Sequence, residues 1–424
     1  MINYKLSIAI FLIILLSLIS KSIYMIPAGH NDTSRLAGIV SLVRYDSFNI
    51  DKTPQLQTTV DKVSYNGQFY SSKPPVLTVL TAKIVSYLFK FKSNLINNDS
   101  AIYRVSTFLT VVIPFVGIFV VFLLISKKLI FKEKKWLQFL TSFLLIFGTL
   151  IFTYSNSLNN HVLEAFLQIL LFYFLFIEPK KTSQRFFLIG ILVSAIFVVD
   201  ITYGFVVAPI TFIYILLQKK IKFLSMFIIG ALPLILLHFI LNYLQFGIFL
   251  PPQLFPNTYL NYLGSNWINV KAGMEAQNHG FIATTFNYVF GTYGLFLYQP
   301  FLLLAFAQKK TFKKPQFIYM FLILIFYLLF NVITSPNYGG SSFGPRRFLP
   351  LIPLLYYFSV QNVVVLWQKS SINRIIILVT LVLTIIISVV GYTNPWNNWD
   401  NINTPGMDLY FPLLYSTRVL FNKI

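Results

Sequence analysis

Long apolar segments separated by short polar ones make up most of the chain. A helix needs about 20 consecutive apolar residues to cross a bilayer, and a charge-free helical pattern of that length predicts a transmembrane helix. On this basis we expect about eleven spans. Their predicted ranges are 5–20, 102–125, 136–153, 161–177, 185–199, 201–217, 223–243, 288–307, 316–334, 349–368 and 375–391. The fifth and sixth are separated only around Asp200 and could instead form one long element.

The composition supports this interpretation. The chain is 56% apolar and only 11% charged, whereas about a quarter of the residues in a soluble domain are charged. We therefore predict an all-α polytopic membrane protein, with residues 1–424 forming a single transmembrane domain. The chain contains no cysteine, which excludes disulfides, thiolate chemistry and cysteine-ligated zinc.

Positive charge is concentrated in short connections on one side of the predicted bundle. The chain has 33 Lys and Arg against 12 Asp and Glu, a net charge of +21. The basic connections lie at 127–135, 180–181, 219–222, 309–314 and 369–374. Short loops of this kind stay cytoplasmic, so we predict a cytoplasmic N-terminus and an outer C-terminal tail. Membrane lipids are the expected partners of this charge, and we expect no nucleic-acid binding.

The long connections fall on the opposite, outer side. They are residues 21–101, 244–287 and 335–348 and the tail 392–424. Loops longer than about 15 residues in a compact protein are usually functional or disordered, and the many aromatic residues here argue against disorder. In the first loop, Leu36, Ile39, Val40 and Val43 recur at helical spacing from Ser34 onward. This pattern predicts an amphipathic helix lying along the membrane interface.

Helix-start signals accompany two predicted interfacial helices in the first outer loop. Asn31 and Asp32 are good N-cap residues for the first. The prolines of "SSKPP" suit the first turn of the second, residues 76–89. If this second helix crossed the bilayer instead, every later basic loop would move to the outer side.

The acidic residues gather on the outer side, which locates any catalytic site there. Asp32 and Asp61 lie in the first outer loop, and His161 and Glu164 lie at the head of the fourth predicted span. General acid–base catalysis needs such groups beside a cleft. The same four side chains could surround a divalent cation, although no ligand spacing demands one.

Three cations are positioned where a lipid phosphate would lie. Lys73 belongs to "YSSKPP", and Arg346 and Arg347 belong to "GGSSFGPRRFLPLIP", directly before the tenth predicted span. Guanidinium groups bind phosphate oxygens bidentately, and ammonium groups bind them as point charges. The alternative is that these side chains extend to lipid headgroups. Three cations in loops shaped by glycine and proline favour a phosphate site.

Four motifs, in order along the chain, resemble the GT-C superfamily of integral membrane glycosyltransferases. They are "NDTSRLAGIVSLVRYDSFNID", "TTVDKVSYNGQFYSSKPP", "SLNNHVLEAFL" and "SSFGPRRFLPLIP". They are similar to the branch that contains the protein O-mannosyltransferases and the aminoarabinose lipid A transferase. The resemblance implies a helical bundle with interfacial helices in the first outer loop and a sugar donor carried on a polyprenyl phosphate. We expect a lipid, glycan or protein acceptor and location in a bacterial cell membrane.

The resemblance also implies roles for individual residues. By position it assigns the catalytic base to Asp32, the donor-phosphate cation to Lys73, the arginine of Gly-Pro-Arg to Arg346, and the polar head of the fourth span to His161. In some relatives the acid instead lies in a pair that matches Asp61–Lys62 here. Two aspartates therefore remain candidates for the base.

We predict a glycosyltransferase that acts at the outer face, with inversion at the sugar. An aspartate would deprotonate the acceptor hydroxyl, and the cations would stabilise the departing phosphate. With Asp32 as the base, Arg35 one helical turn away would hold its orientation; alternatively, Asp32 only caps a helix. A transporter or flippase of lipid-linked sugars is the other class. It should line a path through the bilayer centre with polar groups, and the predicted span centres are nearly free of charge.

Three further polar positions have simpler explanations. Asp200 is either a functional group within the membrane or part of a short turn between two spans. His238, in the seventh predicted span, is expected to be a core residue. The tryptophans of "NPWNNWDN" are typical of an interfacial aromatic belt, with a sugar-stacking patch as the alternative.

Overall fold

The structure is a computed structural model that describes residues 4–178, 182–217, 221–254, 262, 280–334, 342–396 and 411–421. Helices form most of this described chain, and its only sheet is a two-stranded hairpin. The predicted all-α class is therefore confirmed. Parts of the predicted outer loops 244–287 and 335–348 and of the tail 392–424 lie outside the described residues, as do the basic positions 180–181 and 219–220.

Five continuous helical stretches among the described residues are long and apolar enough to cross a membrane. The first runs through α4 (Asp99–Thr107), a π-helical turn (Phe108–Val112) and α5 (Ile113–Leu129). The others are α11 (Ile221–Phe246), α15 (Pro315–Thr334), the 3₁₀ turn Arg346–Leu351 with α16 (Ile352–Leu366), and α17 (Ser371–Thr393). They coincide with five of the predicted spans, and the chain is an integral membrane protein.

Most of the remaining predicted spans correspond to shorter helices. These are α1 (Tyr4–Ser22), α6 (Lys135–Phe147) with α7 (Leu150–Thr153), α8 (His161–Phe172) with a π-helical turn (Tyr173–Ile177), α9 (Ser183–Val199) and α10 (Ile201–Leu216). None of these described helices is among the five stretches that are long and apolar enough to cross a membrane, so the number of spans stays a prediction. Predicted span 288–307 is not one helix. Its glycines and Pro300 break it into α13 (Phe281–Val289), α14 (Leu295–Tyr298) and the 3₁₀ helix Pro300–Phe306.

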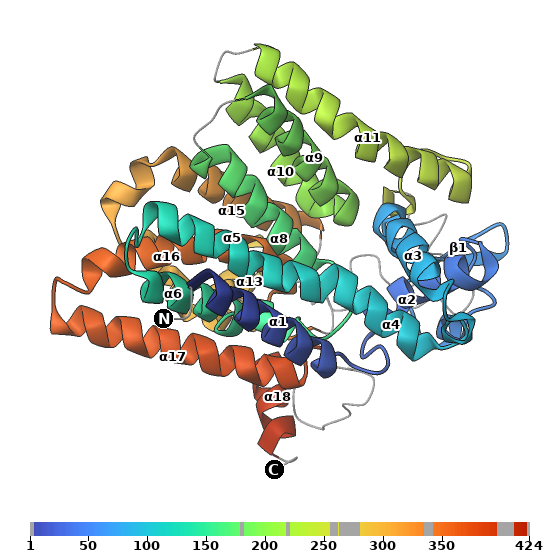
Figure 1. The fold of residues 1–424 in the computed structure, drawn as a ribbon, viewed down its shortest axis with the longest axis horizontal. Helices are drawn as coiled ribbons and strands as arrows, with labels where there is room; N and C mark the ends of the chain where they lie inside the picture. The colour runs from blue at the N-terminus through green and yellow to red at the C-terminus, as the bar shows by residue number, and fades with distance from the viewer. Residues whose placement is uncertain are drawn as a thin grey trace.

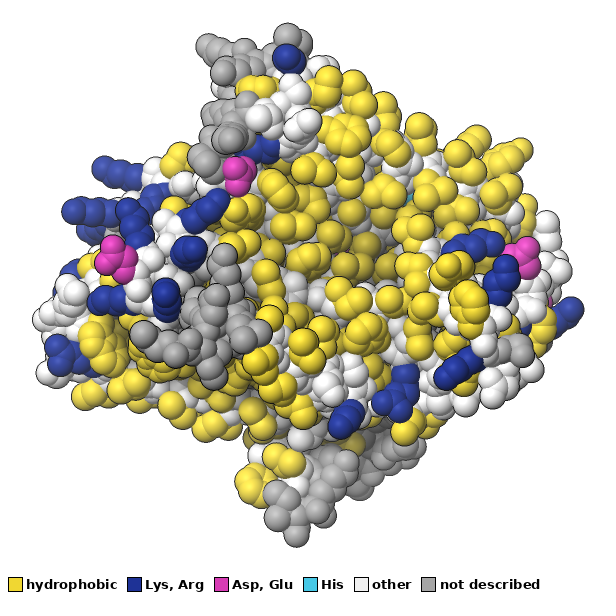
Figure 2. Space-filling model, viewed as in Figure 1, with side chains coloured by type: hydrophobic (Ala, Val, Ile, Leu, Met, Phe, Trp, Pro, Cys, Tyr) yellow, Lys and Arg dark blue, Asp and Glu magenta, His cyan; other side chains and the backbone are white. Residues whose placement is uncertain are grey.

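The described basic connections gather at one end of the bundle, which we call the lysine end. Lys128, at the end of α5, reaches Glu178 after α8, with 3.5 Å between Nζ and Oε2. Lys314, at the start of α15, donates to Gln361 of α16 at 2.9 Å. Figure 2 shows this cluster of Lys and Arg at one side of a broad apolar belt. That all five basic loops share one side, and which side of the membrane this is, both stay predictions.

The opposite end, which we call the loop end, carries the first loop region. It consists of α2 (His30–Tyr45), the 3₁₀ turns Pro54–Gln57 and Ser93–Leu95, β1 (Lys62–Tyr65), β2 (Gln68–Ser71) and α3 (Pro75–Phe89). In Figure 1 these elements lie together beside the start of α4. The 3₁₀ turns Pro252–Leu254 and Lys309–Lys313 and helix α18 (Pro412–Phe421) complete the described elements.

The two predicted interfacial helices are present, with different surroundings. Helix α2 begins at His30 rather than Ser34, and its residues from Asp32 to Ser41 are all buried. It is therefore a core helix of the loop region, not a half-exposed amphipathic one. Helix α3 starts at Pro75, as the "KPP" motif predicts, and exposes Leu80 and Tyr87 on one side.

Helices α9 and α11 cross at unusually short range. A Cβ added to Gly190 would lie 2.1 Å from the carbonyl oxygen of Phe227, and one added to Gly230 would lie 2.1 Å from that of Phe187. Small residues allow such close backbone approach between helices in a membrane. This crossing fixes the position of α11, whose far end reaches the loop region. Helices α9 and α10 are separate elements because Asp200 breaks the chain between them.

Candidate functional site

A tight hairpin brings Asp61 and Lys73 together. Asn66 and Gly67 adopt positive φ values of 50° and 74°, as a two-residue hairpin turn requires. The strands pair so that Lys62 lies opposite Ser71. Asp61 just before β1 and Lys73 just after β2 therefore both lie at the open end of this ladder. The "YNGQ" sequence lies between two short runs of alternating apolar and polar residues, which is a signal for a hairpin. The pattern of long apolar spans does not indicate it.

Asp61 and Lys73 form a shielded ion pair. The Oδ2 atom of Asp61 lies 2.7 Å from Nζ of Lys73, and the side chains are 18% and 13% exposed. Burial favours the neutral carboxyl, but the charges of Lys73 and Arg346 outweigh it and hold the pKa of Asp61 below its usual value. Burial also lowers the pKa of Lys73, and the carboxylate of Asp61 opposes that shift.

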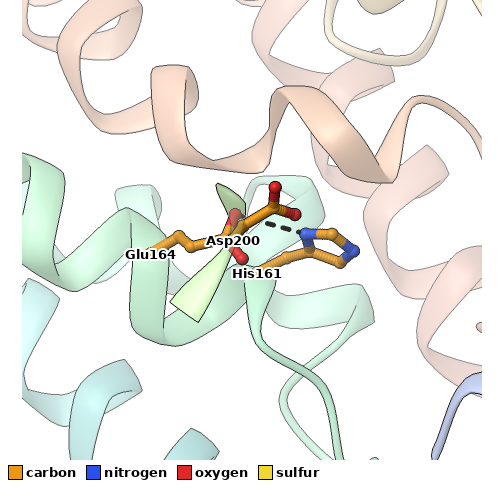
Figure 3. A group of neighbouring side chains, drawn as sticks. All are labelled: His161, Glu164 and Asp200. Atoms are coloured by element: carbon orange, nitrogen blue, oxygen red, sulfur yellow. Dashed lines mark hydrogen bonds and ion pairs between the residues drawn. The ribbon is translucent and has the colours of Figure 1, made fainter. Parts of the chain in front are cut away.

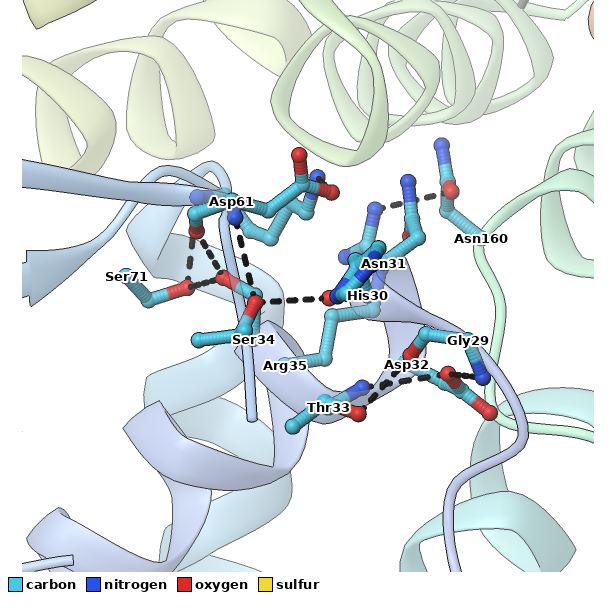
Figure 4. A network of polar contacts seen from close by, with 12 residues as sticks. Gly29, His30, Asn31, Asp32, Thr33, Ser34, Arg35, Asp61, Ser71 and Asn160 are labelled. Carbon is cyan, nitrogen blue, oxygen red and sulfur yellow. Dashed lines mark hydrogen bonds and ion pairs between the residues drawn. The ribbon is translucent and has the colours of Figure 1, made fainter. Parts of the chain in front are cut away.

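Backbone and hydroxyl contacts hold Asp61 in place. The Ser34 hydroxyl donates to the Asp61 carbonyl oxygen at 2.5 Å and lies 2.8 Å from the hydroxyl of Ser71. The Asp61 N–H donates to Oγ1 of Thr59 at 3.1 Å. Figure 4 shows this connection between α2 and the hairpin. The contacts from Ser34 and Thr59 are to the main chain of Asp61, so its carboxylate stays available for Lys73.

Asp32 has a different environment. Its Oδ1 accepts from the N–H groups of Gly29 and Thr33, at 2.8 and 3.1 Å. Its Oδ2 accepts from the N–H of Ala28 and the hydroxyl of Tyr103, at 2.9 and 3.2 Å. Asp32 is fully buried, which raises its pKa to about 6 against the opposing effect of these hydrogen bonds. Each carboxylate oxygen already accepts two hydrogen bonds.

This pattern identifies Asp32 as a helix-start residue. Gly29 is the N-cap of α2 and Asp32 is its third helical residue, whose carboxylate accepts from the N-cap N–H. The prediction that Asn31 or Asp32 is the N-cap is therefore wrong by two or three positions, although the capping role itself is present. Arg35 does not contact Asp32: its Nε donates to Asn31 at 3.3 Å and its Nη2 to Asn160 at 2.7 Å.

A second polar cluster surrounds Asn160 at the start of α8. The amide of Asn160 accepts from Arg35 and donates to Glu164 and to Asp200, the latter at 3.2 Å. Asp200 also caps α10 by accepting from Thr202 N–H at 2.9 Å. Burial lowers the pKa of Arg35 to about 10, and the two acids oppose that shift. Sequence reasoning missed Asn160, which is one of several asparagines in "SNSLNNH".

His161, Glu164 and Asp200 can hold a divalent cation. One ligand atom from each lies within 4.8 Å of the others, and His161 Nδ1 lies 3.4 Å from Glu164 Oε2 (Figure 3). One imidazole nitrogen and two carboxylates suit zinc or another first-row ion. Of the four side chains predicted to surround a cation, His161 and Glu164 belong to this group, and Asp200 is its third member. That a cation binds here stays a prediction.

Arg346 and Arg347 point to different surroundings. The guanidinium of Arg346 stacks 4.8 Å from the ring of Trp396, and its charge acts on Asp61, Lys73 and Arg35. Arg347 instead donates to Asn331 of α15 at 2.9 Å. The structure therefore brings Arg346 toward the Asp61–Lys73 pair, while Arg347 has a separate partner on α15.

Two other residues depart from the sequence interpretation. Lys62 donates to the carbonyl oxygen of Leu56 at 2.8 Å and lies over the ring of Phe69, so it does not join Asp61 in a catalytic pair. Trp396 is only 5% exposed, and its indole N–H donates to Ser157 at 3.1 Å. It is therefore a wall of this site rather than part of an aromatic belt; Trp399 lies outside the described residues.

Comparisons with known proteins place this arrangement in a fold. No model of a known protein family matches the sequence, and no curated protein matches it. The structure of ArnT from Cupriavidus metallidurans bound to undecaprenyl phosphate is similar, with a TM-score of 0.55 and 10% identity, over 92% of this chain and 76% of that one. The apo state of ArnT gives a TM-score of 0.50 at 10% identity over the same shares.

A second type of structure is similar over an even larger part of this chain. The oligosaccharyltransferase of Archaeoglobus fulgidus, solved in complex with zinc and sulfate, matches with a TM-score of 0.52 and 16% identity. The match covers 96% of this chain but only 56% of the archaeal one. ArnT, an aminoarabinose lipid A transferase, and the oligosaccharyltransferase are both GT-C glycosyltransferases. The resemblance predicted from the four motifs is thus confirmed: this chain has the fold of the GT-C glycosyltransferases.

Proposed function

We propose that this chain transfers a sugar from a polyprenyl-phosphate donor to an acceptor hydroxyl at the outer face of a bacterial cell membrane. The acceptor would be a lipid, a glycan or a protein. The fold supports glycosyl transfer in general, and ArnT has been solved with undecaprenyl phosphate bound. The gathering of cations and carboxylates at the loop end supports a site that opens on one face only.

The ion pair of Asp61 and Lys73 carries the proposal. Transfer from a lipid phosphate needs a base for the acceptor hydroxyl and a cation for the leaving group, side by side. The pair supplies both within 2.7 Å, and the charge of Arg346 acts on both members. A phosphate that binds the ammonium of Lys73 would take over this partner of Asp61 and leave the carboxylate free for the acceptor.

The proposed reaction is a single displacement. The acceptor oxygen forms a bond to the anomeric carbon as the bond from that carbon to the phosphate oxygen breaks, which inverts the configuration. Asp61 takes the proton of the acceptor hydroxyl. Lys73 and Arg346 stabilise the charge that develops on the departing polyprenyl phosphate. Asp61 is preferred over Asp32 as the base because both oxygens of Asp32 are already saturated.

A divalent cation at His161, Glu164 and Asp200 is a further part of this proposal. The imidazole and two carboxylates would hold it, and it would add positive charge beside Arg35 and Arg346. The archaeal oligosaccharyltransferase was solved with zinc. If the site is occupied during catalysis, a chelator should abolish turnover and added metal should restore it.

A transporter or flippase of lipid-linked sugars is the alternative function. Such proteins bind substrate near the bilayer centre and move it between faces. Among the described residues, buried and half-buried carboxylates and their cationic partners gather at the loop end, around Asp32, Asp61, Glu164 and Asp200. This one-sided distribution favours the enzyme.

The test is release of prenyl phosphate by the purified protein. A panel of radiolabelled polyprenyl-phosphate sugars is incubated with protein, acceptor-containing membrane extract, and either metal or chelator. We expect release from at least one donor, together with transfer of label. Asp46→Asn is the matched control for Asp61→Asn, because Asp46 is exposed and forms only a loose ion pair with Lys83. Release from no donor, with labelled lipid moved across vesicle membranes, would favour the transporter.

A further inference from the structure

A small polar pocket lies on the α11 side of Lys73 and is not used by the proposed reaction. Its polar lining consists of Ser71, Lys73, His238, Asn242 and Gln245. Prolines 74, 75, 251 and 252, together with Ile201 and Phe246, form the apolar remainder. The cavity measures about 10 Å³, which is enough for one water-sized group.

Two residues that line this pocket each carry a buried nitrogen with no hydrogen-bond partner in the part of the chain that the structure describes. These nitrogens are Nδ1 of His238 and Nε2 of Gln245. His238 is only 1% exposed, as is Asn242 beside it. Leaving a buried polar atom unpaired costs about 1–3 kcal/mol, and nearly all such atoms in folded proteins are satisfied. Two orphaned atoms in the same pocket therefore point to a ligand.

Both orphaned atoms are hydrogen-bond donors. Nδ2 of Asn242 donates to Nε2 of His238 at 3.1 Å and to the carbonyl oxygen of Phe249 at 3.3 Å. Nε2 of His238 therefore acts as an acceptor and carries no proton, which leaves the proton on Nδ1 in the neutral ring. Nε2 of Gln245 belongs to an amide NH₂ group and can only donate. The missing ligand must supply acceptor lone pairs.

The packing of α11 fixes this pocket beside the proposed reaction centre. The ring of Phe246, at the end of α11, lies 5.9 Å from that of Tyr65 and 5.2 Å from that of Tyr70. The hairpin that positions Asp61 and Lys73 thus also anchors the end of α11. Leu241 of α11 packs with Val76 of α3 in the same region. Whatever occupies the pocket lies within reach of the group bound at Lys73.

We propose that this pocket recognises a single hydroxyl of the transferred sugar. A hydroxyl oxygen has two lone pairs, and it can accept from His238 Nδ1 and Gln245 Nε2 at once. A phosphate is too large for the cavity, and a metal ion cannot bind two N–H donors. The inference rests on the proposed glycosyl transfer and deepens it: His238 and Gln245 are specificity residues that select sugars bearing a hydroxyl at one ring position.

Matched pairs of donors test the pocket. Each polyprenyl-phosphate sugar is compared with its deoxy analogues, which lack one hydroxyl at a time, and kcat/KM is measured from release of prenyl phosphate. We expect the wild type to reject one deoxy analogue by at least about tenfold, since a site built to bond a hydroxyl leaves its polar groups unpaired without it. In Gln245→Leu and His238→Phe, the ratio of kcat/KM for the parent sugar to that for the deoxy analogue should fall toward one. The main cause should be slower transfer of the parent sugar.

Controls separate recognition from folding. Leu244→Ala changes an α11 side chain that is 64% exposed, and it should leave the ratio as in wild type. Gln245→Glu keeps the shape but replaces the donor NH₂, and it should also lose discrimination. If Gln245→Leu and His238→Phe slow parent and deoxy sugars equally, the pocket holds only a structural water and the inference is overturned.

A binding measurement keeps the inference separate from the proposed function. Thermal stabilisation of the purified protein by each donor and its deoxy analogue is recorded for the wild type and Gln245→Leu. If no donor releases prenyl phosphate, the proposed function fails. Thermal stabilisation alone then tests the pocket. The hydroxylated sugar should stabilise the wild type more than its deoxy analogue does, and the two sugars should stabilise Gln245→Leu equally. Equal stabilisation by both sugars in wild type would overturn it.

Discussion

Asp32 and Asp61 are two buried carboxylates in the same loop region, and their surroundings differ in one decisive respect. Asp32 accepts four hydrogen bonds, three from the backbone around the start of α2 and one from Tyr103. Among the residues that the structure describes, the carboxylate of Asp61 has a single close partner, the ammonium of Lys73, which is itself a side chain that a phosphate can bind. Burial alone does not distinguish a structural acid from a reactive one.

The comparison teaches that the identity of the donors matters more than burial or sequence position. Backbone N–H groups are fixed by the helix and cannot move away when a substrate binds. Asp32 therefore stays hydrogen-bonded to the start of α2. A lysine side chain can exchange one anion for another. Asp61 can therefore respond to substrate, whereas Asp32 holds the helix that carries Ser34 and Arg35. Four experiments test this division.

Removing the Asp61 carboxylate should have the largest effect. Asp61→Asn keeps the size of the side chain but cannot accept a proton, and general base catalysis contributes about 10²–10⁴ to the rate. We expect kcat for prenyl-phosphate release to fall within that range while the melting temperature changes little. Full activity in this variant would exclude Asp61 as the base.

Removing the Lys73 charge should have the next largest effect. Lys73→Met keeps the length of the side chain and loses the ammonium, and removal of one charge-stabilising group costs about 10²–10³ in kcat. The matched control is Lys62→Gln, since Lys62 bonds a main-chain carbonyl oxygen instead of Asp61. We expect that control to retain activity within about twofold. Equal losses in both variants would indicate a general requirement for positive charge.

Changing Asp32 should reduce stability more than catalysis. In Asp32→Asn the amide NH₂ would face donors that now bond the carboxylate, and an unsatisfied buried group costs about 1–3 kcal/mol. We expect a lower melting temperature in detergent, with kcat reduced less than about tenfold at a temperature where the variant is folded. A folded variant without activity would restore Asp32 as the base.

The dependence of the wild-type rate on pH should be the smallest of the four effects. A base acts in its deprotonated form, so kcat/KM falls as the pH falls through the pKa of that base. The pKa of Asp61 lies below its usual value, so the rate should change by less than about twofold between pH 7 and pH 5. The pKa of Asp32 is about 6; with Asp32 as the base, the rate would fall about tenfold over that interval.

Much of the fold could be predicted from the sequence because apolar length and charge placement are local signals. The long helices α11, α15 and α17 follow directly from uninterrupted apolar runs. The start of α3 followed from its prolines. The break of span 288–307 was missed because its glycines and Pro300 lie within a run that is mostly apolar and free of charge. The burial of α2 was missed because the polar residues that appeared to face solvent bond to neighbouring loops.

The site was only partly predictable, because its contacts join distant segments. Lys73 and Arg346 could be singled out by charge and by their Gly/Pro-shaped loops. The choice between Asp32 and Asp61 depends on which N–H groups surround each, and no sequence pattern specifies that. Asn160 and Trp396 are neutral residues that gain their roles from arginines earlier in the chain. Arg35 precedes Asn160 by 125 positions, and Arg346 precedes Trp396 by 50. Only the folded chain brings them together.

The position of Trp396 has a consequence for how the protein matures. Its ring packs on Gly29, where an added Cβ would approach the indole to 3.1 Å. The guanidinium of Arg346 stacks on the same ring. The helices from α1 to α17 precede this tryptophan in the chain, so they are synthesised before it can reach Gly29. A nascent chain that already contains these helices therefore still lacks the ring that stacks on Arg346 and packs on Gly29, and this corner of the molecule is completed late in synthesis.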